Sequence, residues 1–600
     1  MTTVDSSRPA APAFTSPEKA RRYDTGRYQG AAGLNWYTCD PTIQFLLDFY
    51  LEPEQHEAVR PALTATGALM GGPVAERAEE TDKNPPRLVK YDRWGHDISH
   101  VVMPETMEAS KRDILADRRA LREAAREAGV RGDLLSAVSA YMLNQAEIGM
   151  TCALGTGGDM VADMVDRFAP PDVRDELMPR LLAGEFEGET AQLLTERTGG
   201  SDLGQLETTA TPEGDHYLLN GVKWFASNAN GSVFVVLAKP VGASDDVKGV
   251  ANFLVSRTKR DGSPNGVYIR QLKDKLGTKA VASCEIEFRD AEAFILANRP
   301  GTANGQKSSS ERDGLARMMA LTNASRLGVA MMGLGIARRS LVESLCYARA
   351  REAFGNPIDK HPLMRRKLAE LIVEVEATQA LVFEGHGFQN HTRSQPAARL
   401  RLAPALVKLK AARLGITASI DAIEVHGGNG YCETWPVARQ LRDAQVNTIW
   451  EGTDNILCLD VRRAMERESA EAPFFERLRE AVSNAAETDP TVSLVRRRIG
   501  DLEDAVEAWR QLDRDVAEAR LFPLAQFMID VYAGALLVEQ AAWEARQGVT
   551  DGRKALIARL WAKAHLSDGG ARRGMDDPAD EAMERFDELV AGALVDDRAG

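Results

Sequence analysis

The chain has 600 residues, of which 44% are hydrophobic and 27% charged, and its formal net charge is −14. This composition indicates a folded protein of several domains and excludes a disordered chain. The acidic balance repels polyanions, so nucleic acid is not an expected partner. The six cysteines are scattered without a C-x-x-C pair, and we therefore expect buried free thiols in a reducing cytoplasm and no metal site.

The first part of the chain is predicted to be helical. Residues 1–60 are interpreted as an N-terminal extension with a polar opening, no secretory signal and one helical stretch, "PTIQFLLDFYL". Residues 61–189 are predicted to form an N-terminal α-helical domain. Within it, "AVSAYMLNQAEIGMTCALG" is long and apolar, and "DVRDELMPRLLAG" is amphipathic and ends at a glycine.

Residues 190–295 are predicted to form a middle β domain. The stretch "HYLLNGVKWFASN" carries Asn220-Gly221 between apolar runs, which predicts a hairpin turn at that dipeptide. Further β-rich runs follow, among them "SVFVVLAKP" and "SCEIEFRD". Apolar runs such as "SVFVVLA" and "GALLV" are too short to span a bilayer, so no membrane association is expected.

Helical patterns return after a polar loop, "NRPGTANGQKSSSERDG". Residues 296–468 are predicted to form a helical bundle, in which Leu368, Leu371, Ile372 and Val375 have the spacing of a buried stripe. Residues 469–600 are predicted to add a charge-rich C-terminal helical region. The expected fold class is therefore α+β, with helices, strands and helices in that order.

Two short stretches carry polar groups suited to chemistry. "LLTERTGGSDLGQ" (193–205) offers hydroxyls and freely oriented backbone amides, which suit a polar or anionic cofactor edge. "NTIWEGTDNI" (447–456) places one carboxylate, Glu451, between an indole and a glycine. Taken alone, each stretch is more often a turn or a helix cap.

Four motifs in register resemble those of the acyl-CoA dehydrogenase flavoproteins, over residues from about 140 to 465: "TERTGGSD", "NGVKWFASN", "RAREAFGNPI" and "HGGNGY…RDAQVNTIWEGT". "NPPRLVKYDRWGHD" and "FGNPIDKHPLMRRKL" resemble the AidB-type branch, whose founding members belong to a DNA-alkylation response. The resemblance implies a middle β-barrel or sandwich, a C-terminal four-helix bundle and an extra helical region after it.

The resemblance makes Glu451 the base that removes the α-proton of an acyl thioester. Trp450 would exclude water and move the pKa of this carboxyl toward neutrality, and Gly452 would let the backbone pass close to the ligand. Some branches carry the base in the segment matching "TNASR", which holds no carboxylate here. Glu451 is then the only candidate.

The same resemblance implies FAD as cofactor and assigns its contacts to Gln192, Leu194, Thr195, Gly200, Ser201, Phe225, Ser227, Arg351, Phe354, Gly427, Gly428, Thr453 and Asn455. Of these, Arg351, Phe354 and the two glycines would meet the FAD of a neighbouring subunit, which implies a homodimer or homotetramer. Substrate contacts fall on Ser201, Asn323 and Arg326. Two departures are Glu424, where relatives often have Gln, and Asn323, where they often have Asp.

The expected function is FAD-dependent oxidation of an acyl-CoA to the 2-enoyl-CoA in fatty acid metabolism, with an electron-transfer flavoprotein as acceptor. A DNA-binding alkylation-response flavoprotein is a competing hypothesis. Residues 471–600 hold 26 Asp and Glu against 17 Lys and Arg, despite basic runs at 496–498 and 571–573, which disfavours it. The sequence also leaves open an oxygen-using flavin monooxygenase or nitroalkane oxidase, and a structural protein without FAD.

Overall fold

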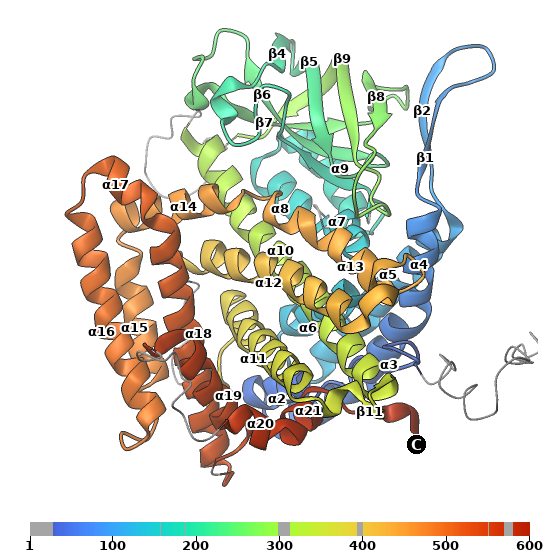
Figure 1. The fold of residues 1–600 in the computed structure, drawn as a ribbon. Coiled ribbons are helices and arrows are strands. Elements are labelled where there is room, and N and C mark those ends of the chain that lie inside the picture. The colour runs from blue at the N-terminus through green and yellow to red at the C-terminus, as the bar shows by residue number, and fades with distance from the viewer. Residues whose placement is uncertain are drawn as a thin grey trace, which may run out of the picture.

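The computed structural model describes residues 28–155, 158–186, 188–297, 312–392, 400–549, 551–568 and 580–599. Figure 1 shows the β domain at the top, helices from both halves of the chain below it, and the C-terminal helices along the left and the bottom. The predicted α+β order is confirmed, since helices, then strands, then helices follow one another along the chain.

The N-terminal part is helical apart from one hairpin. Asp40 caps the first of its helices by accepting from the backbone N–H groups of Thr42 and Ile43 at 3.0 and 3.3 Å. The helices are α2 Pro41–Tyr50, α3 Pro53–Leu69, α4 Ala75–Lys83, α5 Glu105–Glu127, α6 Gly132–Ala146, α7 Ile148–Gly155, α8 Gly158–Phe168 and α9 Pro171–Leu182. Strands β1 Arg87–Tyr91 and β2 Asp97–Val102 form the hairpin, which projects beside the β domain in Figure 1.

The middle domain is a seven-stranded sheet that closes on itself, because β7 pairs with both β6 and β9. Its strands are β3 Thr190–Leu193, β4 Thr209–Glu213, β5 His216–Ala226, β6 Val233–Pro240, β7 Ala251–Ser256, β8 Val267–Leu272 and β9 Cys284–Ile295. The closed sheet buries its own apolar core, with Phe234, Phe253 and Ile286 fully covered.

The hairpin turn predicted at Asn220-Gly221 is wrong. Strand β5 runs through both residues, and the turn between β4 and β5 lies at Gly214, whose φ is +62°. Gly221 has another role: a Cβ there would lie 2.5 Å from the Thr208 hydroxyl oxygen, so only glycine allows this close approach. The local turn signal is overridden by packing within the sheet.

The bundle is built on α10 Arg312–Ala350, a helix of 39 residues. It is accompanied by α11 Pro362–Gly385, α12 Ala403–His426, α13 Pro436–Ala444 and α14 Asp454–Glu468, with a short β10 Glu352–Ala353 and β11 Asn356–Pro357 ribbon after α10. The predicted stripe on α11 is confirmed, since Leu368, Leu371, Ile372 and Val375 are all buried. Most of the polar loop predicted before α10 lies outside the described residues.

The C-terminal region packs against α11 and α12 and shares their core. It comprises α15 Glu471–Ala481, α16 Pro490–Arg510, α17 Arg514–Ala519, α18 Leu521–Arg546, α19 Arg553–Trp561, α20 Glu581–Glu584 and α21 Phe586–Ala593. Buried Arg477 joins Glu384 of α11 to Glu539 of α18, at 2.6 and 2.5 Å. Among the described helices, α18 alone has the length and apolarity of a membrane span, but 72% of that apolar stretch is buried inside the protein.

The thiol prediction holds for five of the six cysteines, which are free and buried. It is wrong for Cys432, which is exposed. This residue directly follows the 3-10 turn Gly427–Tyr431 after α12, where the chain runs on the surface.

Candidate functional site

Glu451 lies in an irregular connection between α13 and α14. A 3-10 turn, Gln445–Thr448, ends α13, and α14 starts at Asp454 with Thr453 at its N-cap. Between them Glu451 adopts φ +57° and Gly452 φ +101°. The Trp450 indole N–H donates to the Asn447 side chain at 3.0 Å, which fixes the aromatic ring next to the carboxylate residue. Left-handed backbone at a glutamate is uncommon and is typical of functional sites.

Two buried cations hold this backbone in place. Arg326 Nε on α10 donates to the Glu451 carbonyl at 3.2 Å, and its Nη1 donates to Asn323 at 3.0 Å and to Asp460 at 2.5 Å. Lys408 Nζ on α12 donates to the Gly452 carbonyl at 2.6 Å. The structure therefore brings Glu451 together with both predicted substrate contacts of α10, and two helices hold the backbone carbonyls of Glu451 and Gly452.

Electrostatics suit Glu451 to proton transfer. Burial raises the pKa of its carboxyl to about 7, although the charges of Arg326 and Lys408 act in the opposite direction. Burial also lowers the pKa of Lys408, to about 8. A carboxylate with a pKa near neutrality is an effective base at neutral pH.

The predicted flavin contacts of the β domain also come together. The Thr195 carbonyl accepts from the backbone N–H of Trp224 at 2.8 Å, so the loop after β3 lies beside the end of β5. A Cβ at Gly200 would be 3.1 Å from the Thr195 side chain, which places the glycine of this loop directly against the threonine. Phe225 extends from the same end of β5 and is 50% exposed.

Buried Cys152 on α7 connects this group to the base. Its thiol hydrogen-bonds with Ser227 and lies close enough to Glu451 for the carboxylate to raise its pKa, while burial is the main cause of a pKa of about 12. The predicted flavin-side hydroxyl and the predicted base therefore border one site between the β domain and the bundle. Ser201, Thr453 and Asn455, which were also predicted to contact ligand, are exposed.

A second group lies at the far end of α10. Arg351 directly follows the helix, 25 positions after Arg326, and a rise of 1.5 Å per residue separates them by about 37 Å. Phe354 follows with φ +52° and 96% exposure. Within one protomer, the site around Arg326 and the residues Arg351 and Phe354 therefore cannot contact the same part of a ligand.

The residues present fit a flavin with an adenosine diphosphate arm. Phe225 and Phe354 are exposed aromatic faces, and Arg351 is exposed as well. A Cβ built on Gly427 or Gly428 meets nothing within 4 Å, so this turn leaves space for a close ligand. An exposed guanidinium and a glycine turn with open space on its surface are suited to a diphosphate.

The Glu424 carboxylate is paired only in part, because Lys367 Nζ lies 2.8 Å from it and also 2.7 Å from the carboxylate of Asp421. Asn323 replaces a carboxylate but still accepts from Arg326.

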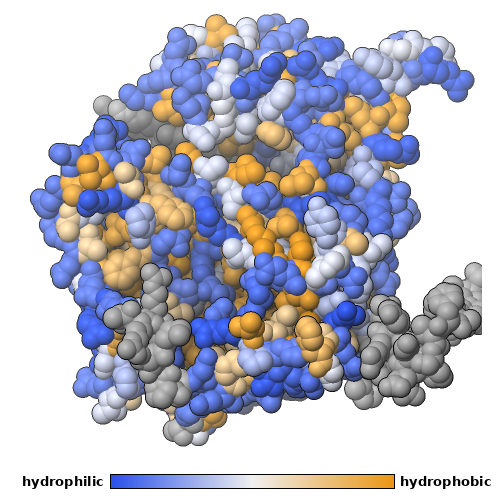
Figure 2. Space-filling model, in the orientation of Figure 1, coloured by the Kyte–Doolittle hydropathy of each residue, from blue (hydrophilic) through white to orange (hydrophobic). Residues whose placement is uncertain are grey.

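The described residues include no group of three His, Cys, Asp or Glu that could hold a metal ion. Figure 2 shows hydrophobic side chains gathered below the β domain, over the α12 and α13 part of this face.

Four residues of the site were not predicted: Cys152, Lys408 and the buried pair Lys223–Glu196, whose charged atoms are 2.6 Å apart. Lys223 also donates to the Leu194 carbonyl at 3.3 Å, so the pair fastens the loop after β3 onto β5. The available signal was a lysine on an otherwise apolar helix face or strand, as in "ALVKLKAARLG" and "NGVKWF". The partners that make these lysines informative are distant in sequence.

Comparisons with known proteins agree with this geometry. Three family descriptions match in series: the adaptive response protein AidB N-terminal domain over residues 28–188, the acyl-CoA dehydrogenase middle domain over 191–291 and the acyl-CoA dehydrogenase C-terminal domain over 312–466. The putative acyl-CoA dehydrogenase AidB of Escherichia coli K12 is 30% identical over 401 residues, which cover 64% of this chain and 70% of that protein.

Two solved structures share the fold. Caenorhabditis elegans ACDH-11 in complex with C11-CoA has a TM-score of 0.79 at 23% identity, over 94% of this chain and 95% of that one. An acyl-CoA dehydrogenase from Bacillus anthracis complexed with FAD has a TM-score of 0.61 at 20% identity, over 87% and 94%. Fold and site together define a flavin-dependent oxidoreductase. The chain belongs to the acyl-CoA dehydrogenase family, in its AidB-like branch.

Proposed function

We propose that the protein is an FAD-dependent acyl-CoA dehydrogenase that oxidises a thioester to the 2-enoyl-CoA, with Glu451 as the base. The observation that carries this proposal is the Glu451 carboxyl, with a pKa of about 7, bordering the same site between the β domain and the bundle as Ser227. Removing a weakly acidic α-proton needs a positioned base of this kind. No other described carboxylate combines this pKa with a held left-handed backbone.

The chain's own residues would act in three ways. The Glu451 carboxylate takes the α-proton, and Trp450 limits access of water to it. Arg326 and Lys408 hold the two carbonyl groups that fix the base in place. The aromatic face of Phe225 and the hydroxyl of Ser227 would orient the flavin, which supplies the hydride acceptor when bound. A hydride leaving the β-carbon and a proton leaving the α-carbon balance the oxidation.

FAD and an acyl-CoA are supported by the relatives as well as by the site. One neighbour in fold was solved with FAD and another with C11-CoA. We infer that Arg351, Phe354 and the two glycines at 427 and 428 serve the FAD of a second protomer, because they lie at the far end of α10. The active unit is then at least a homodimer, and an electron-transfer flavoprotein is the proposed acceptor.

Anaerobic bleaching of the bound flavin by a panel of acyl-CoAs tests the proposal. At least one thioester should bleach the wild type. The Glu451→Gln variant should bind FAD normally but bleach about 10²–10⁴-fold more slowly, because it lacks the base. Glu466→Gln is the matched control, since Glu466 is exposed on the neighbouring helix α14 and its carboxylate pairs with Arg462.

Three results would contradict the proposal. A purified protein without FAD would support a structural role, and an unchanged bleaching rate in Glu451→Gln would remove the base assignment. Oxygen consumption coupled to substrate oxidation, without bleaching under anaerobic conditions, would favour a monooxygenase or an oxidase.

A further inference from the structure

Residues 28–34, which we call the N-terminal strap, lie across the C-terminal half of α10. The strap begins with Tyr28, whose hydroxyl donates a hydrogen bond to the Glu343 carboxylate of α10. The same oxygen is 3.1 Å from His426 Nε2, at the end of α12. Burial and the neighbouring carboxylate raise the pKa of Tyr28, so the phenol stays protonated. One side chain from the N-terminal segment thus joins two helices of the bundle.

His426 stands directly before Gly427 and Gly428, which we call the glycine turn. Its Nδ1 is 2.7 Å from the Ala422 carbonyl, and its ring stacks on Tyr347 of α10 with centroids 4.2 Å apart. Asn429, on the other side of the turn, donates to the Tyr347 hydroxyl at 3.1 Å. The Tyr28 ring also packs edge-on against Tyr347, at 5.3 Å. The residues on both sides of the glycine turn, His426 and Asn429, therefore contact the same side chain, Tyr347 of α10.

The turn itself is free on its outer side. Gly427 ends α12 with φ +59°, and a Cβ on either glycine would meet no atom within 4 Å. The contacts of Tyr28, His426 and Asn429 are with α10 and α12, to which the turn is attached. A turn that is held from within and open outward is prepared to receive a ligand without further ordering.

The C-terminus holds the strap from outside. Arg598 Nη1 donates to the carbonyls of Gly30 and Ala32 at 2.9 and 3.2 Å, and Asp596 pairs with the same guanidinium at 2.8 Å. The Ala31 N–H donates to Glu343 at 3.2 Å. A Cβ at Gly30 would lie 2.9 Å from the Tyr28 hydroxyl, so glycine is required for this close course of the chain.

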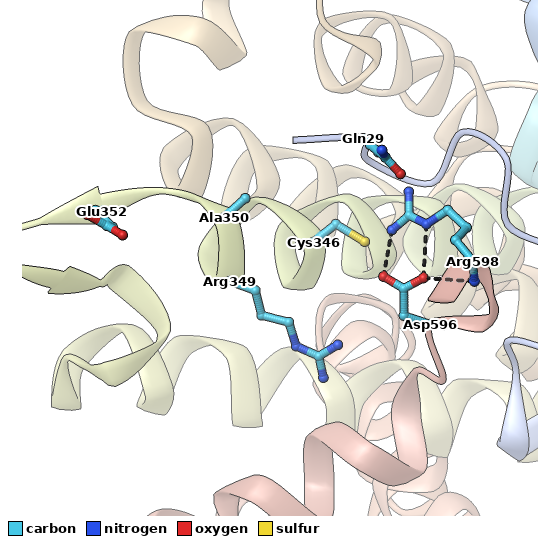
Figure 3. Close-up of a pocket in the computed structure, with 7 residues that line it drawn as sticks. All are labelled: Gln29, Cys346, Arg349, Ala350, Glu352, Asp596 and Arg598. Atoms are coloured by element: carbon cyan, nitrogen blue, oxygen red, sulfur yellow. Dashed lines mark hydrogen bonds and ion pairs between the residues drawn. The ribbon is translucent and has the colours of Figure 1, made fainter. Parts of the chain in front are cut away.

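A cavity of about 300 Å³ lies beside this contact. Figure 3 shows the Arg598–Asp596 pair with Gln29 beside it, and Cys346 and Arg349 projecting from α10. The cavity is lined by Gln29 of the strap, by residues of α10 and by Asp596 and Arg598, so the strap and the C-terminal residues leave part of α10 uncovered. The strap depends on a few specific hydrogen bonds, and single substitutions can test it.

We propose that Tyr28 is a positioning residue for FAD: it fixes the glycine turn against α10 for the cofactor diphosphate of the partner protomer, and Arg598 keeps the strap in place. The inference rests on the proposed function, which assigns the glycine turn to FAD. Tyr28 and Arg598 then contribute to cofactor affinity without touching the cofactor.

The test uses the purified holoenzyme with Tyr28→Phe, which keeps the ring contacts and removes the hydroxyl. FAD should bind about tenfold more weakly on dilution, the effect of losing one hydrogen bond to a charged group. Flavin fluorescence should appear at a lower temperature on heating, while the unfolding temperature by circular dichroism stays close to that of the wild type. Arg598→Met should give a smaller effect of the same kind.

Tyr37→Phe is the matched control, because the Tyr37 hydroxyl makes a similar buried contact with His56, at 2.7 Å, within the N-terminal helical part. It should leave FAD affinity unchanged. The inference is overturned if Tyr28→Phe binds FAD as tightly as the wild type, or if flavin release and unfolding shift together. A wild type that carries no FAD overturns the proposed function as well, so the two failures are distinguishable.

Discussion

At the scale of single residues, Glu451 sets the expected dependence of activity on pH. Burial raises the pKa of its carboxyl to about 7, and only the ionised form accepts a proton. Activity should therefore be lost as pH falls through 7 and should level off above it. Rates of flavin bleaching at low acyl-CoA concentration, measured from pH 5.5 to 8.5, report this group in the free enzyme. A flat profile over that range would exclude Glu451 as the titrating base.

Lys408 should influence the same profile without touching the substrate. Its ammonium is bound to the Gly452 carbonyl at 2.6 Å, and its charge holds the pKa of Glu451 down. Lys408→Met should move the acid limb of the pH profile to higher pH. Lys410→Met is the matched control, because Lys410 is two positions along α12 and pairs with Glu374 at 2.6 Å. An identical limb in both variants would contradict the role given to Lys408.

At the scale of elements, the buried Lys223–Glu196 pair holds the loop after β3 against β5. Both side chains are covered, and Glu196 also accepts from the backbone N–H of Glu207 at 2.6 Å. Lys223→Met should cost about 3–5 kcal/mol of unfolding free energy, because it leaves a buried carboxylate without its partner. Urea denaturation measures this loss. Adding Glu196→Gln to it should restore part of the stability, and additive losses would show that the two groups are uncoupled.

The elements also show where local pattern suffices and where it fails. The α11 stripe was predictable, because Leu368 and Ile372 follow a helical period and their burial needs no knowledge of the partner. The turn at Asn220-Gly221 was not, because a distant residue, Thr208, determines what Gly221 is for. The segment that forms the β1–β2 hairpin was recognised as a motif of the AidB-type branch, but no strands were predicted in it. In the site, Glu451 was found from its motif, whereas Lys408 was missed because its partner is a backbone carbonyl 44 positions away.

At the scale of the whole molecule, charge bears on the hypothesis of DNA binding. The formal net charge is −14, and the basic run at 496–498 is largely used within the protein: Arg498 pairs with Asp501 and Asp568, and Arg496 with the Val482 carbonyl. The run at 571–573 lies outside the described residues.

We therefore expect no retention of the protein on a duplex-DNA column at about 0.15 M salt, because the net charge is negative and two arginines of the basic run are engaged within the protein. The E. coli relative AidB provides a comparison at the same salt. Retention that falls steeply as salt rises would revive the hypothesis of DNA binding.

The backbone of Glu451 has a consequence for how such a protein can be altered. At φ +57° the backbone of a glycine, asparagine or aspartate residue would be less strained. Keeping glutamate there costs about 1–3 kcal/mol of folding free energy. A library of variants screened for thermal stability alone would therefore favour replacement of Glu451, and the replacement would remove the proposed base. At this one position, higher stability and catalytic activity require different residues.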